Sequence, residues 1–137
     1  MYFYFIRSWI KQNKTKRKMK TETIYFQNIQ KSFTFWISEN EEEPFKMLDL
    51  AKPNDIWFHA EKESSCHVIV LIDDDFLSKK EKTTICKRGA FLCKKNTLKL
   101  RCLPSKTVSF LYCKIGNIRR TEKAGCVITE NTKTIMI

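Results

Sequence analysis

Short apolar runs separated by polar turns dominate the chain, and this pattern predicts strands. Residues 23–28 and 32–38 are rich in β-branched and aromatic side chains around a polar connector, which predicts a hairpin. Two further runs, 55–60 and 67–72, are joined by a polar connector too short for a helix, so we expect neighbouring strands. The run 67–72 is almost entirely apolar, which predicts a central place in the sheet.

A short helix and four later strands complete the strand-rich part of the pattern. Pro44 suits the first turn of a helix over 45–51, and Pro53 ends it. The later strands follow in the last third of the chain, and their expected ranges are 107–112, 114–119, 126–129 and 134–137.

A longer helix is predicted over residues 78–95. Ser78 suits its N-cap, and Glu81, three residues further on, suits the partner of a capping box. Gly89 lies inside this helix and lowers its intrinsic stability by about 1 kcal/mol relative to alanine.

These elements predict one α+β domain with a mainly antiparallel sheet, one short helix and one longer helix. A chain of 137 residues suits a single core. We expect the domain over residues 21–137, preceded by a basic, flexible arm over residues 1–20. The apolar start of this arm is interrupted by Arg7 and precedes the charges, so it does not fit a signal peptide. No stretch approaches the roughly 20 apolar residues of a membrane span.

The net charge of +11 is unevenly distributed. Residues 1–20 carry +7, residues 21–77 carry −8 and residues 78–120 carry +12, whereas the last seventeen residues are neutral. A block at +12 inside the folded part is the electrostatic footprint of a polyanion binder. The alternative is a lysine-rich solvated surface, and composition alone supports both interpretations equally.

The six cysteines fit no familiar zinc or disulfide framework and contain no Cys-x-x-Cys pair. Several of them lie inside apolar runs. We therefore expect reduced, buried thiols in a cytoplasmic or nuclear protein. No metal or other cofactor is predicted.

The most specific motif is Asn-Asp-Ile-Trp-Phe-His-Ala at residues 54–60, followed after a small-residue turn by His-Val-Ile at 67–69. This pattern resembles the NFACT-R domain, the RNA-binding module of the NEMF and RqcH ribosome quality-control proteins, which also occurs in short proteins that contain little else. The resemblance covers roughly residues 23 to 137, and its other matching parts are residues 33–60, 108–118, 123–127 and 132–135.

The resemblance implies a structured RNA ligand, either tRNA or the RNA of the large ribosomal subunit, with contacts to ribosomal proteins and a link to ribosome quality control. One departure concerns the turn after the second strand. Family members usually carry Gly-Arg-Asn there, whereas this chain has Ser-Glu-Asn at 38–40 and further glutamates up to residue 43. The acidic turn 39–43 disfavours contact with nucleic acid at this point. It suggests an alternative function as a protein-interaction adaptor with a basic partner.

The candidate binding surface combines the motif with the basic block. Strand alternation places Asp55, Trp57 and His59 on one face, beside His67 of the neighbouring strand. Stacking of an unpaired base on Trp57 or His59 is worth about 1–3 kcal/mol. The nucleic-acid-binding residues predicted in this way are Asp55, Trp57, His59, His67, Lys87, Arg88, Lys94, Lys95, Lys99, Arg101, Arg119 and Arg120.

The motif residues also allow structural and enzymatic interpretations. In the structural one, Trp57 belongs to the core, both histidines support the connector between their strands, and Asp55 binds turn amides. An RNA-modifying or processing enzyme would instead use Asp55, His59 and His67 together, or Cys66 with His59 as nucleophile and base. A metal held by the same three residues lacks a closing motif. Residue types support neither chemistry well, so an enzyme is not expected.

Overall fold

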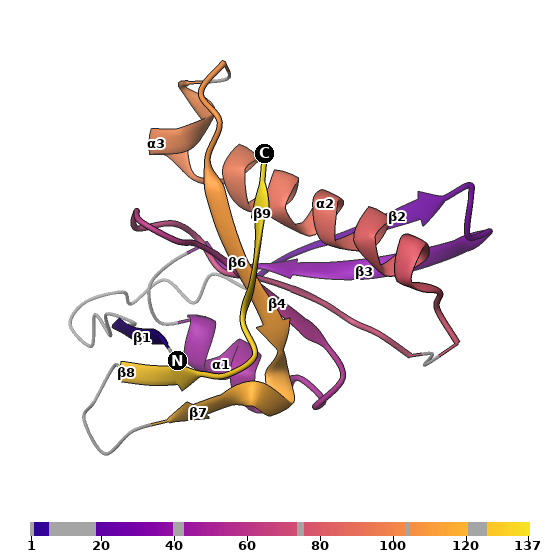
Figure 1. The fold of residues 1–137 in the computed structure, drawn as a ribbon, viewed down its shortest axis with the longest axis horizontal. Coiled ribbons are helices and arrows are strands. Elements are labelled where there is room, and N and C mark those ends of the chain that lie inside the picture. The colour runs from indigo at the N-terminus through magenta and orange to yellow at the C-terminus, as the bar shows by residue number, and fades with distance from the viewer. Residues whose placement is uncertain (1, 6–18, 40–42, 74–75, 104, 121–125) are drawn as a thin grey trace.

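The strands of the computed structural model form two antiparallel sheets, and helices cover the larger one (Figure 1). The structure describes residues 2–5, 19–39, 43–73, 76–103, 105–120 and 126–137. The strands are β1 (Tyr2–Phe5), β2 (Lys20–Phe26), β3 (Lys31–Ile37), β4 (Ile56–Ala60), β5 (Val68–Val70), β6 (Ser109–Lys114), β7 (Ile118–Arg120), β8 (Cys126–Thr129) and β9 (Lys133–Met136). The helices are α1 (Glu43–Leu50), α2 (Lys79–Lys95), α3 (Leu98–Arg101) and the 3₁₀ turn η1 (Ile115–Asn117).

The large sheet has six strands in the order β2-β3-β5-β4-β6-β9, and every neighbouring pair is antiparallel. β2 and β3 form the predicted hairpin, with Thr23 opposite Thr34. β4 and β5 are neighbours, as predicted, and β5 lies between β3 and β4 in the interior of the sheet. The α+β class and the mainly antiparallel sheet are therefore confirmed.

Helices bury both faces of this sheet, so its central strands are almost completely covered. On one face, Phe58 and Phe110 pack in the same cluster as Leu92 of α2. On the other face, Trp57 packs in the same cluster as Met47 of α1. Adjacent residues of a strand point to opposite faces. β4 therefore supplies one buried aromatic side chain to each layer.

Gly89 allows α2 to lie directly on the sheet. A Cβ atom built at this buried glycine would fall against the ring atoms of Phe58. From the sequence, Gly89 is expected only to lower the intrinsic stability of the helix. The packing against Phe58, however, requires a residue without a side chain at this position.

Both predicted helices are present, and their boundaries agree with the predicted ones to within two residues. Ser78 Oγ accepts a hydrogen bond of 3.1 Å from the main-chain N–H of Glu81, and Glu81 Oε1 accepts one of 2.8 Å from the N–H of Ser78. This is the predicted capping box of α2. The predicted range of the short helix is 45–51. α1 begins two residues earlier, at Glu43, and ends one residue earlier, at Leu50. α3 was not predicted, because a single turn without a side-chain cap leaves little signal in the sequence.

None of the described helices is both long and apolar enough to cross a membrane.

The strand predicted over 114–119 is divided in the structure. β6 ends at Lys114, and η1 separates it from β7. The N–H of Ile115 donates a hydrogen bond of 2.8 Å to the carbonyl oxygen of Asp55, and the N–H of Gly116 donates one of 3.0 Å to that of Pro53. These bonds draw the backbone towards the loop before β4 and out of the sheet.

The small sheet brings the start of the chain to a strand near its end. Its order is β1-β8-β7, and β1 pairs antiparallel with β8. The arm expected over residues 1–20 thus includes one strand, and its last residue, Lys20, begins β2. Residues 6–18 of the arm lie outside the described residues.

We expect Gly89→Ala to lower the free energy of unfolding by about 1–3 kcal/mol, because overpacking against Phe58 outweighs the gain in helix propensity. Thr83→Ala on the exposed side of the same helix is the matched control, and its effect should stay within about 0.5 kcal/mol. Urea denaturation measures both variants. A more stable Gly89→Ala protein would contradict the close packing of α2 on β4.

Candidate functional site

Two histidines and a tryptophan meet at one end of the β4-β5 pair. Trp57 Nε1 donates a hydrogen bond of 2.9 Å to His67 Nδ1. The rings of Trp57 and His59 stack almost in parallel at a centroid distance of 5.8 Å, and the ring centroids of His59 and His67 lie 4.5 Å apart. The structure therefore brings the predicted aromatic residues of the motif together.

Trp57 belongs to the core and not to an open surface. Its side chain is 1% exposed and packs with Met47, Ile69 and Cys113. An unpaired base has no access to the indole ring, so the expected stacking on Trp57 does not fit the structure. Strand alternation assigns a residue to a face but does not show what covers that face. Here α1 covers it.

The hydrogen bonds assign the protons of both imidazoles. An indole N–H only donates, so His67 Nδ1 accepts and the proton of this ring lies on Nε2. A carbonyl oxygen only accepts, so His59 Nδ1, which lies 2.7 Å from the oxygen of Ala60, carries the proton of its ring. His67 is thus a neutral imidazole with its proton on Nε2, whereas His59 is protonated on Nδ1.

Burial keeps both rings neutral. It lowers the pKa of His59 to about 4, although the hydrogen bond to Ala60 favours the charged form. Burial also lowers the pKa of His67 well below its usual value, and repulsion from His59 adds to this effect. A histidine with a pKa near 4 is a weak base at neutral pH, which does not favour the enzymatic alternative.

Asp55 serves the backbone at the opposite end of the strand pair. Its carboxylate accepts hydrogen bonds of 2.8 Å from the main-chain N–H groups of Lys52 and Ile72. The residue is 3% exposed, so this carboxylate points into the protein. These contacts match the structural interpretation of Asp55. Within the described residues, no group of three His, Cys, Asp or Glu side chains is placed to hold a metal ion.

The thiol of Cys66 faces α2. Cys66 Sγ lies 4.0 Å from Cys93 Sγ and 3.4 Å from Thr97 Oγ1. A cysteine nucleophile requires a general base within hydrogen-bonding reach. The hydrogen-bonding side chains that the structure places at this thiol are another thiol and a hydroxyl, and neither is a good general base.

The exposed side of α2 carries a basic face with an aromatic ring in it. Lys87, Arg88 and Lys95 are exposed and lie at helical spacing on one side of the helix. Phe91 lies between them and is 44% exposed, and the guanidinium carbon of Arg88 lies 5.8 Å from its ring centroid. We refer to these four residues as the α2 basic face.

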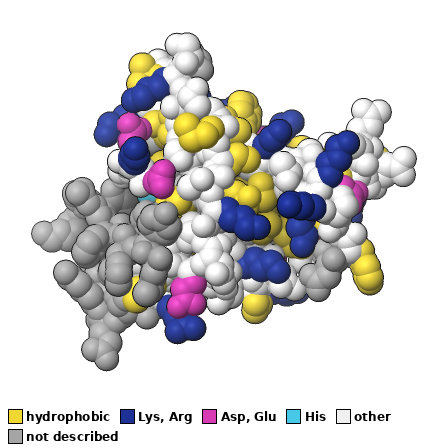
Figure 2. All heavy atoms as spheres, viewed as in Figure 1, with side chains coloured by type: hydrophobic (Ala, Val, Ile, Leu, Met, Phe, Trp, Pro, Cys, Tyr) yellow, Lys and Arg dark blue, Asp and Glu magenta, His cyan; other side chains and the backbone are white. Residues whose placement is uncertain are grey.

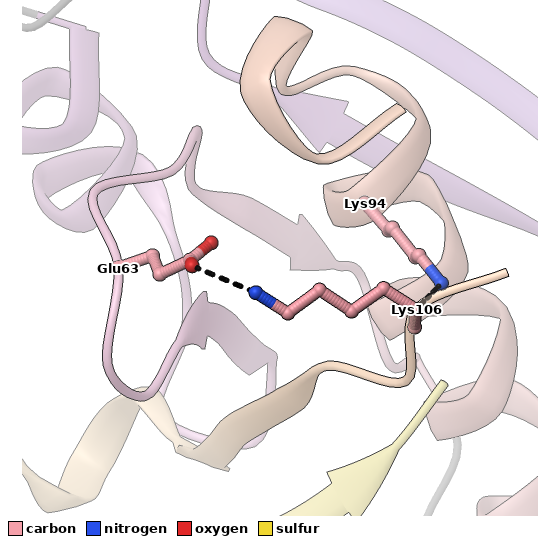
Figure 3. A network of polar contacts seen from close by, with 3 residues as sticks. All are labelled: Glu63, Lys94 and Lys106. Carbon is pink, nitrogen blue, oxygen red and sulfur yellow. Dashed lines mark hydrogen bonds and ion pairs between the residues drawn. The ribbon is translucent and has the colours of Figure 1, made fainter. Parts of the chain in front are cut away.

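Lys94 is held by the main chain (Figure 3). Its Nζ donates hydrogen bonds of 2.7 Å to the oxygen of Lys106 and 3.1 Å to that of Ile137. Lys106 Nζ in turn lies 3.8 Å from Glu63 Oε1. Lys94 thus ties the end of α2 to the segment before β6 and to the C-terminal residue. This role suits a structural lysine better than a phosphate contact.

The remaining predicted basic residues lie beyond α2. Lys99 and Arg101 are exposed on α3. Arg119 is exposed on β7, with its Nη2 atom 3.8 Å from Glu130 Oε2. The side chain of Arg120 lies outside the described part of the structure. Lys99 and Arg101 thus continue the series of exposed basic side chains from α2 into α3.

A second group of lysines was not among the predicted site residues, although two of its members belong to the basic block 78–120. Lys82 and Lys114 line one small cavity of about 30 Å³. Lys133 pairs with Tyr112 across β6 and β9. Figure 2 shows basic side chains gathered over α2 and the adjoining strands β6 and β9. Lys133 lies outside the basic block of the sequence, and only the strand register brings it near the others.

Comparisons with known proteins support the fold without showing a family. No family model matches the chain, and no curated protein matches it. Among solved structures, the chain is similar to the C-terminal part of the fibronectin/fibrinogen-binding protein from Streptococcus suis, with a TM-score of 0.65 and 20% sequence identity. The similarity covers 93% of this chain and 48% of that chain, so this chain spans about half its length. At this identity the likeness shows the fold alone.

We expect the protein to lose stability as the pH falls from 7 to 4. The unfolded histidines bind protons below about pH 6.5, whereas folded His59 does so only near pH 4. The folded state is therefore disfavoured in this interval, and its stability is fully retained above pH 6.5. For His59 the loss is about 3 kcal/mol between pH 7 and pH 4. Urea denaturation across this pH range measures it.

The double variant His59→Asn/His67→Asn is the matched control. An asparagine amide reproduces the Nδ1 position of either ring, with a donor for Ala60 or an acceptor for Trp57, but does not titrate. The chain contains only these two histidines, so the variant should lose most of its pH dependence between pH 7 and pH 5.5. An unchanged pH dependence would contradict the assignment of neutral imidazoles.

Proposed function

We propose that this protein is an RNA-binding module whose ligand is tRNA or the RNA of the large ribosomal subunit. The observation that carries the proposal is the α2 basic face, where Lys87, Arg88 and Lys95 surround the exposed ring of Phe91. Lysine and arginine neutralise phosphates, and an exposed aromatic ring offers a stacking surface to an unpaired base. This combination suits loops and single-stranded regions of a structured RNA.

The distribution of charge supports an approach from the α2 side. The acidic segment 21–77 includes α1, which packs against the sheet face opposite to α2. The basic segment 78–120 includes α2 and α3. A polyanion is therefore attracted to one side of the sheet and repelled by much of the remainder. Such an arrangement orients the protein on RNA as well as binding it.

The resemblance to NFACT-R domains supports the same ligand class. It suggests a link to ribosome-associated quality control in the cytoplasm, with the nucleus as a second compartment, and further contacts with ribosomal proteins. Phosphate contacts are assigned to the α2 basic face, together with Lys99 and Arg101. Asp55, Trp57 and His67 support the strands behind this surface. No catalytic step is proposed.

We expect the double variant Lys87→Gln/Lys95→Gln to weaken binding of the full chain to tRNA by about tenfold near 100 mM salt. If both lysines contact phosphates, the slope of log K against log salt should become shallower by about 1–2. Fluorescence anisotropy with labelled tRNA over a salt series measures both quantities. Phe91→Ala tests base stacking separately and should weaken binding about tenfold without changing the slope.

Lys46→Gln/Lys52→Gln is the matched control, because it removes the same charge from exposed positions in and just after α1. Its affinity should stay within about twofold of the parent protein. Equal losses in both double variants would show that only net charge attracts the RNA. Absence of binding even at low salt would reject the RNA-binding proposal and favour the protein-interaction adaptor.

A further inference from the structure

Two cysteines that are 27 residues apart in the sequence lie side by side where β5 meets α2. Cys66 Sγ and Cys93 Sγ are 4.0 Å apart. Each thiol also approaches the main chain of the other residue: Cys66 Sγ lies 3.4 Å from the oxygen of Cys93, and Cys93 Sγ lies 3.1 Å from the oxygen of Cys66. The two side chains are therefore held in contact by both backbones.

We propose that Cys66 and Cys93 form a peroxide-sensitive dithiol, which closes to a disulfide between the segment just before β5 and the C-terminal part of α2. A disulfide bond is about 2.05 Å long, so the two sulfur atoms must approach by about 2 Å. Side-chain rotation supplies a movement of this size. The inference rests on the contact between the two thiols and does not depend on the proposed function.

The environments of the two thiols give them different roles. Cys66 is partly exposed, whereas Cys93 is fully buried. The hydrogen bond from the Cys93 thiol lowers the pKa of Cys66 against the opposing effect of burial, and the hydroxyl of Thr97 and the charge of Lys20 act in the same direction. Burial raises the pKa of Cys93 well above its usual value. Cys66 is thus the attacking thiol and Cys93 the resolving one.

The fold keeps the charge of Lys20 close to this pair. Lys20 is the first residue of β2, and its Nζ donates a hydrogen bond of 3.1 Å to Asn96 Oδ1 at the end of α2. Thr97 follows directly, and its hydroxyl accepts a hydrogen bond of 3.0 Å from the N–H of Cys66. The end of α2 therefore positions both groups that stabilise a thiolate at Cys66.

The reaction consumes one hydrogen peroxide for each disulfide. The Cys66 thiolate attacks one peroxide oxygen, the O–O bond breaks, and the leaving hydroxide takes a proton to become water. Cys66 is now a sulfenic acid, oxidised by two electrons. Cys93 then attacks the sulfur of Cys66, so that the S–S bond forms and the S–O bond breaks. The departing hydroxide takes the proton of Cys93 and leaves as a second water.

The other described cysteines differ from Cys66 in exposure or in acidity. Burial raises the pKa of both Cys86 and Cys113 to about 12, which disfavours their thiolates. Cys102 is exposed on the surface after α3. If exposure alone governs oxidation, Cys102 should react before Cys66. The order in which Cys66 and Cys102 react therefore distinguishes a preorganised dithiol from the simple oxidation of an exposed thiol.

The test treats the reduced chain of 137 residues with one equivalent of hydrogen peroxide, alkylates the remaining thiols and maps peptides by mass spectrometry without reduction. We expect the loss of two thiols per chain, a linked peptide that joins Cys66 to Cys93, and reversal by dithiothreitol. The oxidised protein should also melt about 5–10 °C higher than the reduced one, because the disulfide constrains the unfolded chain.

Three variants test the roles of the two thiols. Cys93→Ser keeps a hydroxyl that can donate to Cys66 and should leave a sulfenic acid on Cys66 that dimedone traps. Cys93→Ala removes this donor and should give the same adduct more slowly. Thermal unfolding checks that both Cys93 variants remain folded. Cys102→Ser should form the linked peptide at the rate of the parent protein. Oxidation of Cys102 before Cys66, a link between any other cysteines, or no dimedone adduct at Cys66 in the Cys93→Ser protein would overturn the proposal.

Discussion

The hydrogen bond from Trp57 Nε1 to His67 Nδ1 is the interaction on which the centre of the sheet depends. Helices bury both faces of β4 and β5, so any polar group between them requires a partner inside the protein. Trp57 supplies the donor and a neutral His67 supplies the acceptor. At the other end of the strand pair, Asp55 accepts the N–H of Ile72. His67 at one end of this buried strand pair and Asp55 at the other therefore each accept a hydrogen bond from a buried N–H group.

This arrangement explains why charge is displaced to the outer surfaces of the helices. A sheet covered on both faces offers no side for lysine or arginine at its centre. α2 must present an apolar side to the sheet, and Gly89 lets it approach the ring of Phe58 closely. The basic residues of this helix are then left on its outer side, where Phe91 stands among them. The α2 basic face is thus a consequence of the packing as well as a candidate for binding.

Local patterns predicted most of the elements but little of what covers them. The β2-β3 hairpin, the β4-β5 pair and the capping box at Ser78 follow from signals that span a few residues. The pairing of β1 with β8 depends on segments more than 100 residues apart, which no local pattern reports. The burial of Trp57 depends likewise on α1, and the contact between Cys66 and Cys93 depends on how α2 lies across the sheet.

The motif that carries the resemblance to NFACT-R domains therefore needs a different interpretation from the one its composition suggests. A tryptophan, two histidines and an aspartate in a short span look like a set of ligand contacts. In the structure, Trp57 and His67 satisfy one another, His59 binds its own strand, and Asp55 closes a turn. The motif specifies a doubly covered strand pair, and any protein with that arrangement could use it regardless of its ligand. Under the proposed function, the residues that bind RNA are therefore those outside the motif, on surfaces that the strand pair supports.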